Sequence, residues 1–169
     1  QTEYLYLDED YPYLACYVDY EITYMSDEIL CVAFQDHYFN GSMWGEYCDL
    51  RTRVINLATA ERYEIEDVLH SDDTLAEAYY EKICEQSDSF NEAPAFTAGM
   101  AGQTMDGEIL DGRYYSNYVL CKNDIYVNLT YHYYDEGLIM HGWLSTPWTM
   151  EELEPYRTDS DLWEKYSAE

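Results

Sequence analysis

YLACYVDYEITYMSDEILCVAFQDHYF, residues 13–39, contains two segments whose side chains alternate between two faces. In the first segment, residues 13–24, one face is predicted to carry Leu14, Cys16, Val18, Tyr20, Ile22 and Tyr24. The second segment, residues 28–39, repeats this period of two, which is typical of β-strands. Ser26 and Asp27 form a turn signal between them. The stretch therefore predicts an antiparallel hairpin of two long strands.

The rest of the chain adds four strands and one long helix. Extended or alternating patterns predict further strands at residues 47–57, 113–120, 125–133 and 137–146. Leu75, Tyr79 and Ile83 recur at helical spacing, which predicts a helix over residues 72–87. Shorter helical turns are expected at residues 66–69 and 148–154, and around Leu162 and Trp163.

Six strands with one long helix between two strand groups predict an α+β fold. We expect a mostly antiparallel β-sheet with one main α-helix packed on one face. A chain of 169 residues suits a single domain over residues 1–169. Within it we expect an acidic lead-in at residues 1–11, a loop excursion at residues 88–112 and a polar tail at residues 157–169.

The chain is strongly acidic, with a formal net charge of −27 and a pI near 4.1. Such a field repels phosphate backbones and anionic lipid surfaces, so we expect no nucleic acid partner. The sequence contains no run long enough to span a bilayer, so we expect no direct membrane insertion of this chain. The same field steers cationic proteins toward the chain, although acidity could also serve solubility alone.

Motifs that carry chemistry are missing from the sequence. It has no HExxH, GxSxG, P-loop or GxGxxG pattern, and its five cysteines contain no CxxC pair. Its four histidines lack the spacing of metal ligands. We therefore predict no catalytic residue, no metal and no cofactor. The 35 carboxylates leave open one alternative, an envelope hydrolase that uses a carboxylate pair.

A short loop between the second and third predicted strands is the candidate binding site. Trp44 lies in this glycine-containing loop, and Tyr38, Glu46 and Tyr47 flank it. Aromatic side chains bordered by carboxylates suit a basic protein surface, because the rings bury area while the acids pair with Lys and Arg. The alternative is that Trp44 folds back over the edge of the sheet.

Two phrases, VINLATAERYEIEDVL at residues 54–69 and WTMEELEPY at residues 148–156, carry a resemblance over roughly residues 20–157. Together with the order of the elements, they are similar to the RsiV-like extracytoplasmic domain. That family forms the outer part of a membrane-anchored anti-sigma factor that senses lysozyme, and it also occurs beside peptidoglycan deacetylase domains. Here Ser42 and Trp44 stand where the family's Gly-Gly-Ala-His loop has its second glycine and its histidine. Thr59-Ala60-Glu61 likewise lacks the glycine of the family's Thr-Gly-Lys turn.

The resemblance implies a non-catalytic binding or sensor domain at the bacterial cell envelope. It further implies an extracytoplasmic location, membrane anchoring in the parent protein, and lysozyme or another cationic protein as the partner. One alternative is a module that binds peptidoglycan or another cell-wall glycan, with some of the 21 tyrosines as stacking platforms. The carboxylate-pair hydrolase is the second alternative.

Overall fold

The computed structural model of the protein describes residues 15–39, 46–86, 113–135 and 138–167. These residues form two antiparallel sheets of three strands, and each sheet follows chain order. The first sheet contains β1 (Ala15–Met25), β2 (Ile29–Phe39) and β3 (Glu46–Asn56). The second sheet contains β4 (Arg113–Leu120), β5 (Ile125–Asp135) and β6 (Leu138–Trp148).

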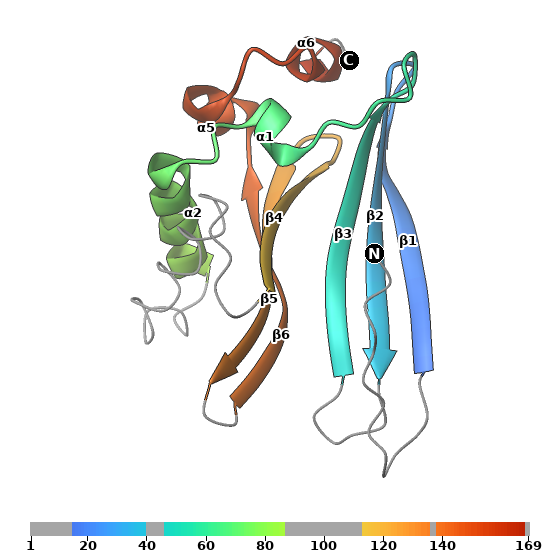
Figure 1. Cartoon of the computed structure of the whole chain (residues 1–169). Coiled ribbons are helices and arrows are strands. Elements are labelled where there is room, and N and C mark those ends of the chain that lie inside the picture. Colours follow the sequence, from blue (N-terminus) through green and yellow to red (C-terminus); the bar gives the residue numbers. More distant parts are fainter. Residues whose placement is uncertain (1–14, 40–45, 87–112, 136–137, 168–169) are drawn as a thin grey trace.

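The helices gather on the far side and at one end of the second sheet. Figure 1 shows this sheet between the first sheet and α2 (Asp73–Gln86), with the short helices at the end where α6 lies. The short elements are α1 (Ile65–Val68), α5 (Met150–Leu153), the 3-10 turn η1 (Glu154–Tyr156) and α6 (Leu162–Ser167). No helix among the described residues is both long and apolar enough to cross a bilayer.

The prediction of mostly antiparallel β structure is confirmed, but the strands form two sheets instead of one. The expected strand positions agree with the observed ones to within about two residues. Alternation along a strand determines which side chains share a face, yet it does not determine which strands pair. In the structure β3 pairs with β2 and β4 pairs with β5, but β3 and β4 do not pair with each other. They are therefore edge strands of two different sheets.

The core fills the space on both sides of the second sheet. In β5, Ile125, Val127 and Leu129 are buried on one face, and Asn128 and Thr130 are buried on the other. From the first sheet, the core receives chiefly Tyr24, Ile29, Cys31 and Val54. The Leu120 N–H donates to the Cys31 sulfur at 3.4 Å, which joins the two sheets, and burial raises the pKa of this thiol. The second sheet is therefore the middle layer of the molecule.

A β-bulge in β1 corrects the predicted distribution of side chains between its faces. Tyr20 pairs with Phe34 and Ile22 with Val32, whereas Tyr24 pairs with Cys31, so Thr23 is the extra residue. The added residue turns Tyr24 into the core, where it is buried, while Ile22 stays exposed. The prediction that Tyr24 shares a face with Tyr20 and Ile22 was wrong, because strict alternation ignores such an insertion.

The turn after β3 holds a non-glycine residue in a left-handed conformation. Ala60 has φ 61°, and its N–H donates to the Asn56 carbonyl at 2.8 Å. The Asn56 side-chain oxygen accepts from the Ala58 N–H at 3.0 Å, which fixes the turn from within. This conformation is the one that glycine adopts without steric cost, and the sequence has alanine there.

The segment expected to be a polar tail contributes to the core. Leu162, Trp163 and Tyr166 are buried, in agreement with the small helix predicted around the first two. The Trp163 indole N–H donates to the Val68 carbonyl at 3.1 Å, and the Tyr166 hydroxyl donates to the Cys121 carbonyl at 2.6 Å. Helix α6 thus closes the end of both sheets.

Candidate functional site

The predicted loop site lies at the end of the first sheet, where β2 leads into β3. The strand register pairs Tyr38 with Tyr47 and Phe39 with Glu46, so the sheet brings the flanking positions together. Trp44 falls in residues 40–45, outside the described part of the chain. The structure therefore supports the neighbourhood of Tyr38, Glu46 and Tyr47 along the backbone, and the role of their side chains stays a prediction.

A row of polarisable side chains crosses all three strands next to this end. The register places Tyr17 opposite His37, and His37 opposite Cys48. The Tyr17 and His37 rings stack with centroids 4.5 Å apart, and His37 Nδ1 lies 3.1 Å from the Cys48 sulfur. A thiol beside an imidazole also occurs in nucleophilic sites. The sequence did not predict this contact, because no pairing was predicted between the second and third strands, and that pairing brings Cys48 to His37.

Exposed apolar side chains concentrate on β1. Six large hydrophobic residues are exposed in the described chain, and only Leu57 lies outside this strand. The five on β1 are 52% to 67% exposed and comprise Tyr17, Val18, Tyr20, Ile22 and Met25. Isolated exposed apolar residues are ordinary, but a contiguous group is typical of an interaction site.

Four of these five residues belong to one continuous surface, which we call the outer face. The apolar residues of the outer face are Val18, Tyr20, Ile22 and Met25 on β1, half-buried Leu30, Val32 and Phe34 on β2, and half-buried Ile55 on β3. The register places four charged residues on the same side, Asp36 on β2 and Asp49, Arg51 and Arg53 on β3. It is the side of the first sheet opposite to the buried Ile29, Cys31 and Val54. The second sheet covers that buried side, as Figure 1 shows. The outer face is therefore apolar over β1 and most of β2 and charged along β3, and no described element covers it.

The first two strands carry acidic residues and no basic ones, whereas β3 brings Arg51 and Arg53 to the outer face. The first 50 residues contain 11 Asp and Glu residues and no Lys or Arg, since Arg51 is the first basic residue of the chain. On β1, Asp19 and Glu21 are exposed and alternate with Tyr20 and Ile22. An apolar surface within an acidic region favours a partner that is itself apolar and basic.

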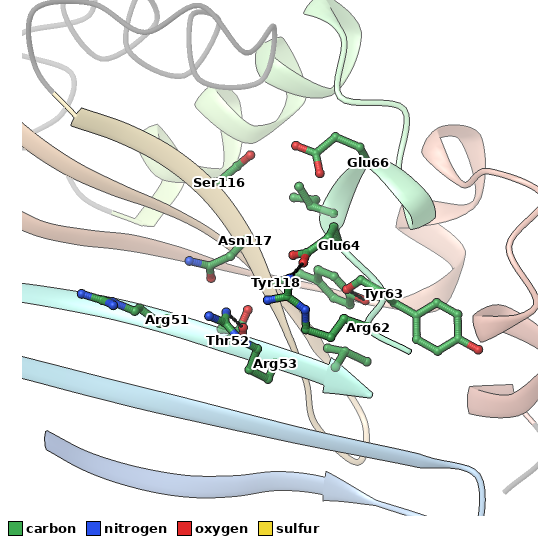
Figure 2. Close-up of a pocket in the computed structure, with 12 residues that line it drawn as sticks. Arg51, Thr52, Arg53, Arg62, Tyr63, Glu64, Glu66, Ser116, Asn117 and Tyr118 are labelled. Carbon is green, nitrogen blue, oxygen red and sulfur yellow. Dashed lines mark hydrogen bonds and ion pairs between the residues drawn. The ribbon is translucent and has the colours of Figure 1, made fainter. Parts of the chain in front are cut away.

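Three basic residues gather beside the outer edge of β3, where an isolated bridge joins Ile55 to Arg62. Arg51, Arg53 and Arg62, three of the chain's eight basic residues, line a cavity of about 360 Å³. In Figure 2 the cavity lies between β3, the segment at Arg62 and β4, from which Asn117 and Tyr118 face it. These three arginines form a local concentration of basic residues in an acidic chain.

Most of this positive charge is already neutralised. Arg51 Nε lies 2.8 Å from the Asp36 carboxylate, and an Arg62 Nη lies 3.0 Å from the Glu64 carboxylate. Arg53 has no carboxylate at ion-pair distance among the described residues, and it donates to the Thr52 carbonyl at 2.6 Å. The cavity thus offers one guanidinium, that of Arg53, to an anionic group.

A second hollow beside the Ala60 turn is lined by four carboxylates, Glu61, Glu64, Asp67 and Asp161. Asp161 accepts from Lys165 at 2.6 Å and from the Tyr63 hydroxyl at 2.9 Å, and these bonds lower the pKa of its carboxyl. A general acid needs the opposite shift, because it must hold its proton near neutral pH. The contacts of Asp161 therefore favour a structural role, which is to tie α6 to the turn.

The described residues contain no group of three His, Cys, Asp or Glu side chains that could hold a metal ion. No protein-family model and no curated protein matches the chain. Membership of the RsiV-like family therefore stays a prediction. The exposed strand β1 and the arginine-lined cavity, like the contact between His37 and Cys48, were not predicted from the sequence. Alternation along β1 defines two faces, and nothing in the sequence indicates which of them stays exposed.

Proposed function

We propose that the protein is a non-catalytic binding domain that docks a cationic protein on the outer face of its first sheet. The observation that supports this most directly is the concentration of exposed large apolar side chains on β1. Exposed tyrosine, valine and isoleucine keep apolar area in water, and a partner that covers them gains about 25 cal/mol per Å² of apolar area removed from water. Such surfaces on soluble domains are typical of recognition sites.

The charge of the molecule supports a basic partner. The whole chain has a net charge of −27, and its first two strands contain no Lys or Arg. Their field therefore attracts cationic proteins and repels acidic ones. Association would be steered by this field, and the apolar contacts of the outer face would then hold the complex. Specificity comes from the combination, because charge alone would bind any basic protein.

In this proposal the domain is an RsiV-like sensor of the cell envelope, and lysozyme is its partner. The parent protein would be membrane-anchored, with the domain outside the cytoplasm. We also propose that α2 is the one main helix packed on a sheet. Two contacts favour it: the Tyr79 hydroxyl donates to the Leu144 carbonyl at 2.9 Å, and Lys82 Nζ lies 4.7 Å from the centre of the Trp148 ring.

Calorimetry with hen-type lysozyme at low and at physiological salt tests the proposal. We expect saturable one-to-one binding that persists at physiological salt, where exposed charge pairs alone are largely screened. The double variant Tyr20→Thr with Ile22→Thr should weaken binding at least tenfold, since both residues are exposed and threonine keeps strand propensity. Leu57→Thr is the matched control, because Leu57 is exposed but lies outside the sheets. Trp44→Ala tests the predicted loop in the same series.

Two outcomes would contradict the proposal. Binding that disappears at physiological salt would show only a non-specific attraction between an acidic and a basic protein. Equal affinity of the Tyr20→Thr, Ile22→Thr double variant and the unmodified chain would remove the outer face from the site. Circular dichroism of each variant establishes that a loss of binding does not come from unfolding.

A cell-wall glycan is the second candidate, and the exposed rings of Tyr17 and Tyr20 favour it. Sugar rings stack on such aromatic faces through apolar contacts. Their binding should depend little on salt, whereas binding of a cationic protein should weaken as salt increases. A sedimentation assay with purified peptidoglycan at two salt concentrations separates the two candidates.

A further inference from the structure

Strand β1 has one paired edge and one unpaired edge. In the first sheet β1 lies at the end of the order, and it pairs with β2 alone. Within the described residues no strand pairs with its other edge. An unpaired strand edge presents a row of backbone N–H and C=O groups that a further strand can bind.

One hydrogen bond shows where this edge opens. The Tyr20 N–H donates to the side-chain carboxylate of Asp19, its own neighbour, at 2.8 Å. A backbone N–H that is directed at β2 would instead bond to a carbonyl of that strand, so the Tyr20 N–H belongs to the open edge. Asp19 therefore occupies a donor that an incoming strand could use, and a carboxylate is easily displaced from an exposed bond.

The two faces of β1 require different side chains from an incoming strand. Val18, Tyr20 and Ile22 lie on the outer face, while Asp19 and Glu21 lie on the opposite side and are exposed. Residues that lie directly opposite each other on neighbouring strands point to the same face of the sheet and contact each other. An added strand would extend the outer face with apolar residues and would meet Asp19 and Glu21 with Lys or Arg. Its pattern is therefore a strict alternation of apolar and basic residues.

The bulge defines one end of the open edge. Residues 16–22 are exposed without interruption, and the bulge at Thr23 then distorts the strand. Pairing would stop at the bulge, because an extra residue breaks the regular ladder. The edge thus fits a segment of about seven residues.

A second copy of the chain is disfavoured at this edge in the antiparallel register centred on Tyr20. In an antiparallel pair of β1 strands centred on Tyr20, Asp19 of each copy would face Glu21 of the other. Like charges directly opposite each other are destabilising. The acids therefore act against self-pairing and select a basic partner.

We infer that β1 is a docking edge for an extended segment of a basic protein, in which apolar residues alternate with Lys or Arg. This inference rests on the proposed function for the class of partner, and it adds the mode of binding. Backbone pairing would supply the hydrogen bonds, and the alternation would supply the selection. Release of Asp19 from the Tyr20 N–H would make its carboxylate available to a basic side chain.

A peptide series with the whole 169-residue protein tests the inference. The probe is a capped, fluorescent heptapeptide with alternating lysine and valine, measured by anisotropy at physiological salt. We expect it to bind at least tenfold more tightly than a peptide of the same composition with lysines and valines in separate blocks. N-methylation of alternate residues on its pairing edge should reduce affinity at least tenfold, because it removes backbone donors. An alternating glutamate and valine peptide should not bind.

Protein variants locate the site. Asp19→Asn together with Glu21→Gln should weaken binding of the alternating peptide at least fivefold. Asp27→Asn together with Glu28→Gln is the matched control, since it removes the same charge from the turn of the same hairpin. Hydrogen exchange should show new protection of β1 amides in the complex. All four substituted positions are exposed, so the variants should fold like the unmodified chain.

Three results would overturn the inference. Equal affinity for the alternating and block peptides would show a purely electrostatic contact. Full affinity of the N-methylated peptide would show that the edge is not used. A concentration-dependent dimer in sedimentation velocity that Tyr20→Thr abolishes would assign the edge to a second copy. If lysozyme binding still depends on Tyr20 and Ile22 in the first two cases, the proposed function stands and only the edge pairing fails.

Discussion

The two sheets have the same number of strands and the same topology, but their surroundings are opposite. In β5 the four consecutive residues 127–130 are all buried, whereas in β1 residues 16–22 are all exposed. The second sheet is covered on one side by the first sheet and on the other by helices (Figure 1). The difference indicates a division of labour: the second sheet stabilises the fold, and the first sheet holds a surface out to a partner.

The contact between the sheets is partly polar. Asn117 donates to the Leu50 carbonyl of β3 at 2.9 Å and accepts from Asn128 at 2.9 Å. Asn128 in turn accepts from the Ser145 hydroxyl at 2.6 Å. A chain of hydrogen bonds with a buried residue at its centre favours one arrangement of its partners. It therefore fixes how the first sheet sits on the second.

The largest expected effect separates the two sheets by stability. Leu129 is fully buried, so Leu129→Ala should lower the free energy of unfolding by about 2–5 kcal/mol through lost burial and an unfilled cavity. Ile22→Ala on β1 should change it by less than about 0.5 kcal/mol, because Ile22 is exposed. Urea unfolding followed by circular dichroism measures both. Equal losses would contradict the division between the sheets.

The next effect concerns the polar chain between them. Asn128→Ala removes the partner of Asn117 and of Ser145, and should cost about 1–3 kcal/mol because it deletes a buried amide and leaves two half-buried polar groups without that partner. Asn123→Ala, in the exposed turn between β4 and β5, is the matched control and should have little effect. The same unfolding assay applies. A neutral Asn128→Ala would mean that the sheets are held by apolar contacts alone.

A smaller and opposite effect is expected in the turn that leaves the first sheet. Ala60→Gly should raise the free energy of unfolding by about 1 kcal/mol, because glycine adopts a φ of 61° without the steric cost that alanine bears. Ala58→Gly in the same exposed turn lacks this strain and should destabilise slightly through chain entropy. Thermal unfolding of the three proteins side by side decides the sign. Destabilisation by Ala60→Gly would contradict the assigned conformation.

The smallest effect depends on pH. Hydrogen bonds from Lys165 and Tyr63 lower the pKa of Asp161, so its ionised form stabilises the fold above the pKa of the unfolded chain, about 4. This contribution is lost as the pH falls through the lower folded pKa. The melting temperature of Asp161→Asn should therefore lie below that of the unmodified chain at pH 7, and the difference should shrink toward pH 3. Asp159→Asn is the control, and a difference that grows on acidification would refute the assignment.

Much of this fold could be predicted from the sequence, and the limits have physical causes. Strands and α2 follow from periodicity because a period of two or of 3.6 reflects burial on one side. The separation into two sheets could not be predicted, because the sequence patterns of β3 and β4 do not show whether these two strands pair with each other. The bulge at Thr23 was not predicted for a different reason: one inserted residue leaves the alternating pattern on both sides of it intact.

The candidate site could be predicted less well. The backbone pairing of β2 with β3 brings the positions of Tyr38, Glu46 and Tyr47 together, in agreement with the prediction that these residues flank one loop. The exposure of Tyr20 and Ile22 was not predicted, because alternation gives two faces and does not say which one a second sheet covers. Arg51 and Arg53 alternate along β3, but their meeting with Arg62 depends on the path of the chain after Ala60.

Hydrogen exchange on the two sheets, with and without bound lysozyme at physiological salt, tests the division of labour most directly. The account predicts that bound lysozyme slows exchange in β1 and in the adjacent part of β2, and leaves the already protected amides of β4 and β5 unchanged. Protection that appears only around the arginine-lined cavity, or equally across both sheets, would contradict it.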